Sequence, residues 1–233
     1  MRNYLVFGGV DSRDYGIYIS GNHTFNSPQR EYENISVPGR DGDLLGTSTR
    51  LANIELTYPA FFYKPDLLAA FRSKLLSMVG YADLEDTYNP DEFRKAVYKG
   101  GLEAEMMANL SGGSFDLVFE CKPQRYLKDG QILSPVSSGM VINNPTDFRS
   151  QPLIRTVGSG TLVIGSQTIT VASNSYSYIN IDCEMMDCYS GANNCNSLVS
   201  FSGNDFPVLE PGPNNVTITG LTSMMIKTNT WRV

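Results

Sequence analysis

The sequence is poor in the residues on which many enzymes and metal sites depend. It contains a single histidine, His23, in a loop-like Gly-Asn-His-Thr stretch. A Ser-His or Cys-His nucleophile pair would have to use this residue, which we expect to be a solvated loop histidine. No dinucleotide-binding, phosphate-loop, G-x-S-x-G or H-E-x-x-H motif occurs. We therefore expect no enzymatic activity and no cofactor.

Clustered positive charge and long apolar runs are missing as well. The chain has 18 Lys and Arg against 24 Asp and Glu, a net charge of −6, and no basic cluster. Because a phosphate backbone is bound by clustered basic side chains, specific binding of nucleic acid is not expected. No stretch approaches the roughly 20 apolar residues of a membrane helix, and the N-terminal apolar run is too short for a signal-peptide core. Folding in a cytosol, without membrane insertion, is the expectation.

Cysteine and acidic clusters give weak signals for a metal or catalytic site. Cys183, Cys188 and Cys195 lie close together in the sequence with no histidine near them, so they do not form a zinc pattern. We expect reduced thiols in a β-domain, and a disulfide within the cluster remains the alternative for a protein exposed to air. Solvated turn charges are a simpler explanation than a glycosidase carboxylate pair for the acidic pairs Asp41/Asp43, Glu85/Asp86 and Asp91/Glu92.

One polar stretch between two strand-like runs, 30–36 and 47–63, predicts a projecting hairpin over residues 37–45. Pro38-Gly39 fits the centre of a type II turn, and Asp41-Gly42 is a second turn signal. Such a tip cannot bury itself, because its backbone groups would lack hydrogen-bond partners. It is either solvated or docked on another subunit. The candidate oligomer-interface residues are therefore Pro38, Gly39, Arg40, Asp41, Gly42 and Asp43.

The surrounding pattern is mainly β with one helix. Residues 54–58 alternate between apolar and polar side chains, as in a half-buried strand. A helix is predicted over 65–79, with Pro65 at its first position and Gly80 just beyond its end. One helical face carries apolar side chains at the required spacing, namely Leu68, Phe71, Leu75 and Met78.

A change in composition near residue 134 indicates a domain boundary. Residues 1–133 carry 14 basic and 18 acidic side chains, whereas residues 134–233 carry 4 and 6. The second part contains short strand-like runs separated by Gly and Pro, such as 161–164 and 168–171 around Gly165. Many short strands with such turns are typical of a β-sandwich or jelly roll. We therefore expect two domains, 1–133 and 134–233.

Several motifs occur in a characteristic order along nearly the whole chain. The N-terminal motifs are Tyr15-Gly16-Ile17, the hairpin from Val37 to Gly42, Thr57-Tyr58-Pro59, Leu84-Glu85-Asp86 and the segment from Asn89 to Arg94. The C-terminal ones are Ile179 to Asp182 with Tyr189, the segment from Asn204 to Gly212 with Asn214-Asn215, and Trp231-Arg232. Each motif is weak alone, but in their joint order they resemble the distal tail protein (Dit) family of long, non-contractile-tailed phages and prophages.

The resemblance implies a fold and an assembly. The first domain would be a split β-barrel with one flanking helix, as in tail-tube proteins, and the second a galectin-like β-sandwich. The protein would form a hexameric ring at the virion's tail tip, assembled in the bacterial host cytoplasm. Its partners would be the tail-tube protein, the tail-associated baseplate hub protein and receptor-binding or adaptor proteins. DNA would pass through the ring without specific binding, which suits an acidic protein.

Two other functions stay open from the sequence. A tail-tube subunit would share the first domain, although the second half of the chain favours a distal position. A carbohydrate-binding tail protein for host recognition would use the sandwich, because function lies in a site rather than in a fold. The cysteine cluster and Thr228-Asn229-Thr230 depart from the family pattern and leave the local geometry of the second domain open.

Overall fold

The computed structural model describes residues 2–21, 26–46, 50–108, 111–203 and 205–233. The chain divides into two compact units, the first Met1–Arg125 with Val233 and the second Tyr126–Arg232. This division lies within the long strand β10 (Gly113–Leu127). The boundary expected from the sequence, between residues 133 and 134, lies further along the chain, where β11 (Ser134–Val136) begins. The two positions differ because the fall in the number of charged side chains comes later in the sequence than the point at which the chain passes from one compact unit to the other.

The first unit is built on a curled antiparallel sheet in the order β2-β1-β7-β8-β10-β6-β3, with β9 also paired to β10. A bridge between Asn3 and Ile19 brings the chain before β1 to β3, at the other end of this order. A short 3-10 turn, Ser12–Tyr15, separates β2 from β3. The strands of this sheet in the first unit are β1 (Leu5–Phe7), β2 (Val10–Asp11), β3 (Ile17–Ile19), β6 (Ile54–Phe62), β7 (Ala82–Asp86), β8 (Glu92–Tyr98), β9 (Ala104–Met106) and β10. The short strand β22 (Trp231–Arg232) belongs to the second unit.

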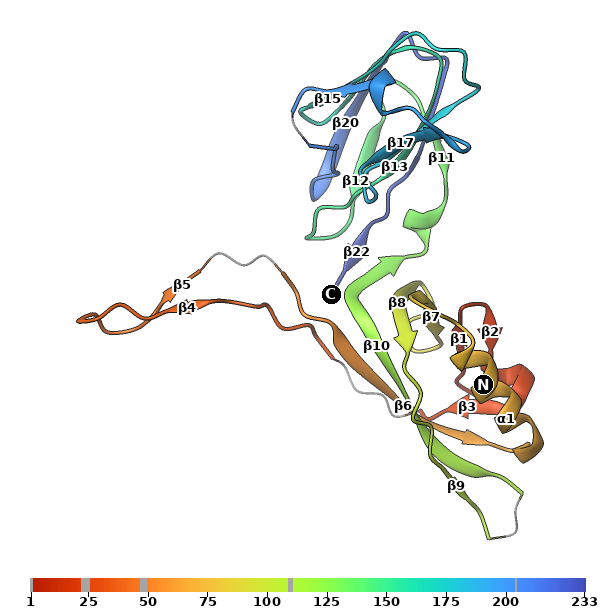
Figure 1. Ribbon diagram of the computed structural model, residues 1–233. Helices are drawn as coiled ribbons and strands as arrows, with labels where there is room; N and C mark the ends of the chain where they lie inside the picture. The colour runs from red at the N-terminus through yellow and green to blue at the C-terminus, as the bar shows by residue number, and fades with distance from the viewer. Residues whose placement is uncertain (1, 22–25, 47–49, 109–110, 204) are drawn as a thin grey trace. The chain divides into compact units, whose positions relative to one another are not determined.

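Strand β6 shows why the sheet has one apolar face. Ile54, Tyr58, Ala60 and Phe62 are buried, whereas Glu55, Thr57 and Pro59 are exposed. This is the predicted alternation, and it is confirmed. Strand β10 also points alternate side chains into the core. Its Leu117 lies opposite Tyr58 of β6, and both side chains are buried in the same cluster. Figure 1 shows β6 and β10 as the two long strands of this unit.

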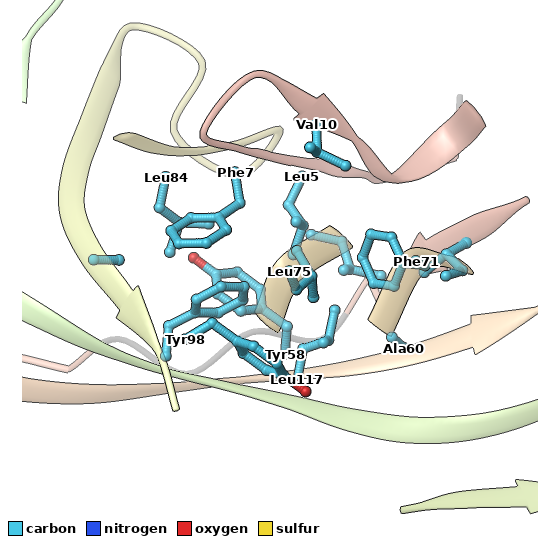
Figure 2. Close-up of a cluster of buried hydrophobic side chains, with 14 of the residues drawn as sticks. Leu5, Phe7, Val10, Tyr58, Ala60, Phe71, Leu75, Leu84, Tyr98 and Leu117 are labelled. Atoms are coloured by element: carbon cyan, nitrogen blue, oxygen red, sulfur yellow. The ribbon is translucent and has the colours of Figure 1, made fainter. Parts of the chain in front are cut away.

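The helix α1 (Pro65–Leu76) covers the apolar face of the sheet. Phe71 and Leu75 are completely buried and pack among the side chains of β1, β6 and β10. Figure 2 shows both side chains in this cluster, together with Phe7 and Tyr58. The predicted apolar face is therefore confirmed at its centre.

The predicted end of the helix, residue 79, is wrong. The helix ends at Leu76, with Ser77 as its C-cap. The Ser77 hydroxyl donates to the Lys74 carbonyl, and the Met78 amide donates to the Leu75 carbonyl three residues back. This tighter closure satisfies the last carbonyls before Gly80 is reached. Gly80 has the positive φ of 88° expected of a turn glycine, but it lies beyond the cap.

The second unit is a β-sandwich of two antiparallel sheets, in the orders β11-β21-β13-β16-β17-β18 and β12-β20-β14-β15-β19. Ile154 and Ile226 of the first sheet and Leu162 and Val216 of the second belong to one buried core. The predicted hairpin around Gly165 is formed by β14 and β15. The strands not yet given are β12 (Val141–Asn144), β13 (Leu153–Val157), β14 (Gly160–Ile164), β15 (Gln167–Val171), β16 (Ile179–Asp182), β17 (Asp187–Ser190), β18 (Asn193–Asn194), β19 (Val199–Phe201), β20 (Gly212–Thr219) and β21 (Ser223–Lys227).

Two 3-10 turns, Asp129–Gln131 and Asn196–Leu198, complete the regular structure of the second unit. The chain is thus mainly β, and α1 is the single α-helix of the described residues. Within those residues, no helix is long and apolar enough to cross a membrane.

Candidate functional site

The most prominent feature of the first unit is a two-stranded arm, defined here as residues 29–46 with 50–52. A bridge between Arg30 and Leu51 closes its base, just before β6 begins at Ile54. Further out, β4 (Asn34–Ile35) and β5 (Leu44–Leu45) pair in antiparallel register, with Ile35 opposite Leu44. Figure 1 shows β4 and β5 as a narrow ribbon that leaves the sheet. The predicted hairpin therefore exists, with β4 and β5 as its two paired strands.

The arm tip, residues 37–43, has the turns that the sequence predicts. The Arg40 amide donates to the Val37 carbonyl at 3.2 Å, and Gly39 between them has a φ of 80°. This is a type II turn, in which Gly tolerates the positive φ at the third position. Gly42 has a φ of 78° and makes the second turn. Apart from Val37, every side chain of the tip is exposed, including those of Arg40, Asp41 and Asp43.

The shaft of the arm exposes apolar side chains instead of burying them. The exposed fractions are 54% for Tyr32, 46% for Ile35, 40% for Leu44 and 64% for Leu45. An isolated two-stranded ribbon is at best marginally stable in water. An exposed ion pair between Arg50 and Glu31, 2.8 Å long, adds little to that stability. The arm has the properties of a segment that binds another surface.

A pocket of about 590 Å³ lies near the base of the arm, within the first unit. Its walls come from β6, from β7 with the following turn and β8, and from the end of β10. We call it the arginine pocket, and its defining residues are Leu56, Tyr58, Asp86, Tyr88, Arg94 and Arg125.

Asp86 holds one side of the arginine pocket together. One carboxylate oxygen accepts a hydrogen bond from the Tyr58 hydroxyl at 2.8 Å. The other accepts from the backbone amides of Tyr88 and Asn89, each at 2.9 Å. Burial, reinforced by the negative charge of Asp86, raises the pKa of Tyr58 well above its usual range. The phenol therefore stays protonated and donates to Asp86.

The two arginines of the pocket differ in how far their charge is compensated. Arg125 pairs with the buried carboxylate of Glu92 at 3.3 Å and donates to the Val233 carbonyl at 2.5 Å. Arg94 makes one long hydrogen bond, 3.4 Å to the Pro123 carbonyl, and has no ion pair within the described part of the chain. Burial lowers the pKa of Arg94, and the nearby positive charge of Arg125 acts in the same direction. Arg94 is thus a half-buried cation that forms no ion pair with a described residue, although the negative charge of Asp86 acts on it.

The cysteine cluster is buried in the sandwich core. Cys183, Cys188 and Cys195 are nearly inaccessible and carry free thiols. The Cys195 amide donates to the Cys188 carbonyl at 2.7 Å. Burial raises the pKa of Cys183, and it raises that of Cys188 to about 12. Within the described residues, no group of three or more His, Cys, Asp and Glu side chains could hold a metal ion.

The other acidic pairs have different environments. Glu85 and Asp86 lie on β7, where Asp86 is the hydrogen-bonded acceptor of the pocket rather than a free turn charge. Asp91 is exposed, whereas Glu92 is 3% exposed and paired with Arg125. His23 lies outside the described residues.

Known structures identify the fold. No protein-family model and no curated protein sequence matches the chain. A crystal structure of the Dit (gp 19.1) protein of phage SPP1 does match, with a TM-score of 0.73 over 97% of this chain and 98% of that one. The chain has the Dit fold. The two proteins are 15% identical, so the likeness concerns the fold. The resemblance to the distal tail protein family, predicted from sequence motifs, is confirmed at this level.

The Dit fold places the predicted tip residues and the arginine pocket on the same unit. Sequence motifs identified the tip, Pro38 to Asp43, but did not identify Arg94 and Arg125 as site residues. Arg94 lies in the segment from Asn89 to Arg94, which belongs to the family-like pattern. That segment indicated the fold and did not indicate a site. No pattern in the sequence predicts that Arg94 and Arg125, which lies on β10, line the same pocket.

Proposed function

We propose that this chain is a structural, non-enzymatic component of a phage tail tip. The SPP1 protein with the same fold is described as a paradigm of the hub adsorption apparatus in phages that infect Gram-positive bacteria. We assign the present chain a corresponding role in the virion, after assembly in the host cytoplasm.

In this proposal six copies form a ring around a central channel. The first unit forms the ring and contacts the tail-tube protein on one side and the tail-associated hub protein on the other. The second unit is an outer platform for receptor-binding or adaptor proteins. DNA passes through the channel without specific binding, since a net charge of −6 opposes adhesion of phosphate.

The observation that carries the assembly proposal is the arm with its exposed apolar shaft. A cyclic ring needs a heterologous contact, in which one patch of a subunit meets a different patch of the next. The arm supplies one such patch, with Pro38 to Asp43 at its tip. Docking would bury the shaft side chains Tyr32, Ile35, Leu44 and Leu45, which are exposed in the single chain.

The test is the mass of the purified protein by light scattering, with negative-stain images of the same sample. We expect a ring of about six times the 25.7 kDa chain mass, with a central hole. The double variant Ile35→Ser and Leu45→Ser should keep the fold and lose the ring. Met185→Ser is the matched control, because Met185 is 70% exposed in the second unit and should leave assembly unchanged. A ring that persists in the double variant would contradict the role of the arm.

A carbohydrate-binding role is less well supported. Sugar sites use exposed aromatic rings, and the large apolar side chains exposed on the described part of the sandwich are Ile132, Met140, Val141, Met185 and Met186. Binding to a glycan array by the purified protein would favour that alternative. A tail-tube subunit would instead form long filaments by itself.

A further inference from the structure

Arg94, in the arginine pocket, carries a guanidinium whose hydrogen-bond donors the single chain leaves mostly unused. Taking a guanidinium out of water is costly unless an anion or several hydrogen bonds replace the lost hydration. Arg94 has only its 3.4 Å bond to Pro123, and its pKa is lowered by burial. Asp86 shares the pocket and its negative charge acts on Arg94, but its oxygens accept hydrogen bonds from Tyr58, Tyr88 and Asn89, and it forms no ion pair with Arg94. The pocket therefore has space, and Arg94 has free donors, for an additional carboxylate.

The arm tip contains the complementary groups. Asp41 and Asp43 are exposed, and neither has a hydrogen bond or ion pair with another described residue. They sit on two consecutive turns at the end of a ribbon only two strands wide, so they can enter a recess that a flat surface could not. A planar guanidinium and a carboxylate make the strongest class of charge-assisted hydrogen bond in proteins.

The tip cannot fill the pocket of its own chain. The bridge between Arg30 and Leu51 and the pairing of Ile35 with Leu44 hold the two sides of the arm together. Counted along the described side from Arg30 to Arg40, at about 3.3 Å per residue, the tip lies up to roughly 30 Å from the base of the arm. The pocket lies in the opposite direction along β6, at Leu56 and Tyr58. An arm that reaches a pocket must therefore reach that of another copy.

We infer that the arginine pocket of one copy receives the arm tip of the next copy, with Arg94 paired to Asp41 or Asp43. This inference rests on the proposed ring and names the surface on which its arms dock. The contact is heterologous, because tip and pocket are different patches of the same chain. Each copy offers both patches, so the contact can repeat from subunit to subunit.

Site-directed cross-linking tests this contact directly. The double variant Asp41→Cys and Asn89→Cys places one thiol on the tip and one beside the pocket, and a short bis-maleimide reagent joins thiols that lie close together. The native cysteines are buried and should not react. We expect a ladder of covalent oligomers up to the full ring in denaturing gels. Each single variant should give dimers at most. Asp41→Cys with Ser73→Cys, on the exposed face of α1, is the matched control and should give no ladder.

Charge reversal provides a second measurement. Asp41→Lys with Asp43→Lys should weaken assembly by about tenfold or more, and adding Arg94→Glu should restore part of the loss. Asp147→Lys, an exposed site in the second unit, controls for added charge. If Arg94→Glu does not fold, the tip variants and the cross-linking decide the question.

The outcomes separate this inference from the proposed function. A ring of the wild-type protein together with a cross-linked ladder of the double cysteine variant supports both. A wild-type ring without a ladder of that variant overturns the pocket contact and leaves the ring standing. A wild-type protein that stays monomeric at every concentration, with no ladder of the variant, overturns both.

Discussion

Leu75 and Leu76 provide a matched pair that tests how the first unit is held together. The two leucines are adjacent in α1, but Leu75 is 0% exposed in the core and Leu76 is 50% exposed. Replacing a buried leucine with alanine removes its apolar contacts and leaves a cavity, at a cost of about 2–5 kcal/mol. Alanine is at least as good a helix former as leucine, so neither change weakens the helix itself. We expect Leu75→Ala to lower the free energy of unfolding by this amount and Leu76→Ala by less than about 0.5 kcal/mol.

Urea unfolding with two probes measures the difference. Far-UV circular dichroism follows both units, whereas the fluorescence of Trp231, the one tryptophan, reports on the second unit. Its ring stacks on Phe148 with centroids 4.4 Å apart, and its Nε1 donates to the Arg149 carbonyl. The chain has two units, so the transitions are fitted separately. Equal losses for Leu75→Ala and Leu76→Ala would refute the assignment of the buried face.

Three further predictions concern the tip, the thiols and the pocket. Changing Arg40 and Asp41 to alanine should alter monomer stability by no more than about 0.5 kcal/mol, because both are exposed, while light scattering should show weaker assembly; unchanged assembly would contradict docking by the tip. A thiol reagent at pH 8 should modify none of the four cysteines until denaturant is added, since burial raises the pKa of Cys188 to about 12 and also raises those of Cys121 and Cys183; rapid reaction of the folded protein would show that the thiols are accessible. The pKa of Tyr58 is raised in the folded state, so the contribution of this phenol to stability is complete below the ordinary pKa of 10.0 and is lost as the pH rises from there towards the folded pKa. Tyr58→Phe should therefore lose less stability at alkaline pH than the wild type does, as measured by urea unfolding at two pH values. Identical losses in both proteins would contradict the assignment.

The parts of the fold that the sequence predicts are those with strong local periodicity. Strand β6 alternates polar and apolar side chains, and α1 has a complete apolar stripe. In both elements the sequence pattern alone indicates which face is buried. The tip turns were equally predictable, because Gly39 and Gly42 supply the positive φ values that these turns need. In each case the necessary information lies within a few consecutive residues.

Strand β7 could not be predicted in this way. Its sequence, Ala82 to Asp86, is acidic and buries only Leu84 fully, and such a composition is unusual in strands. The strand forms because it pairs with β1 on one side and β8 on the other. Cross-strand contacts such as the ion pair between Asp83 and Lys95 offset its poor intrinsic preference. This information lies in tertiary pairing and is absent from the segment itself.

The arginine pocket was missed for a related reason. Tyr58, Asp86, Arg94 and Arg125 come from four different strands, and none of them has a chemically distinctive neighbour in the sequence. Only the antiparallel pairing of β6, β8 and β10 and the adjacent β7 brings them around one space. The sequence therefore predicted the arm tip, which is one side of the proposed contact. The arginine pocket, which is the other side, could be recognised only in the structure.

The arrangement of these two halves along the chain limits how copies can assemble. A tip that docked on the same patch of its partner would give a closed dimer, and no further copy could join. Here the tip and the pocket are separated by the length of the arm, so docking leaves one free tip and one free pocket at the two ends of any chain of copies. Growth then stops only if the rotation from one copy to the next closes the circle. In the proposed assembly, the angle at which β4 and β5 leave β6 would set the number of subunits, and a change in the arm's base should alter ring size while leaving the proposed contact between Arg94 and the tip intact.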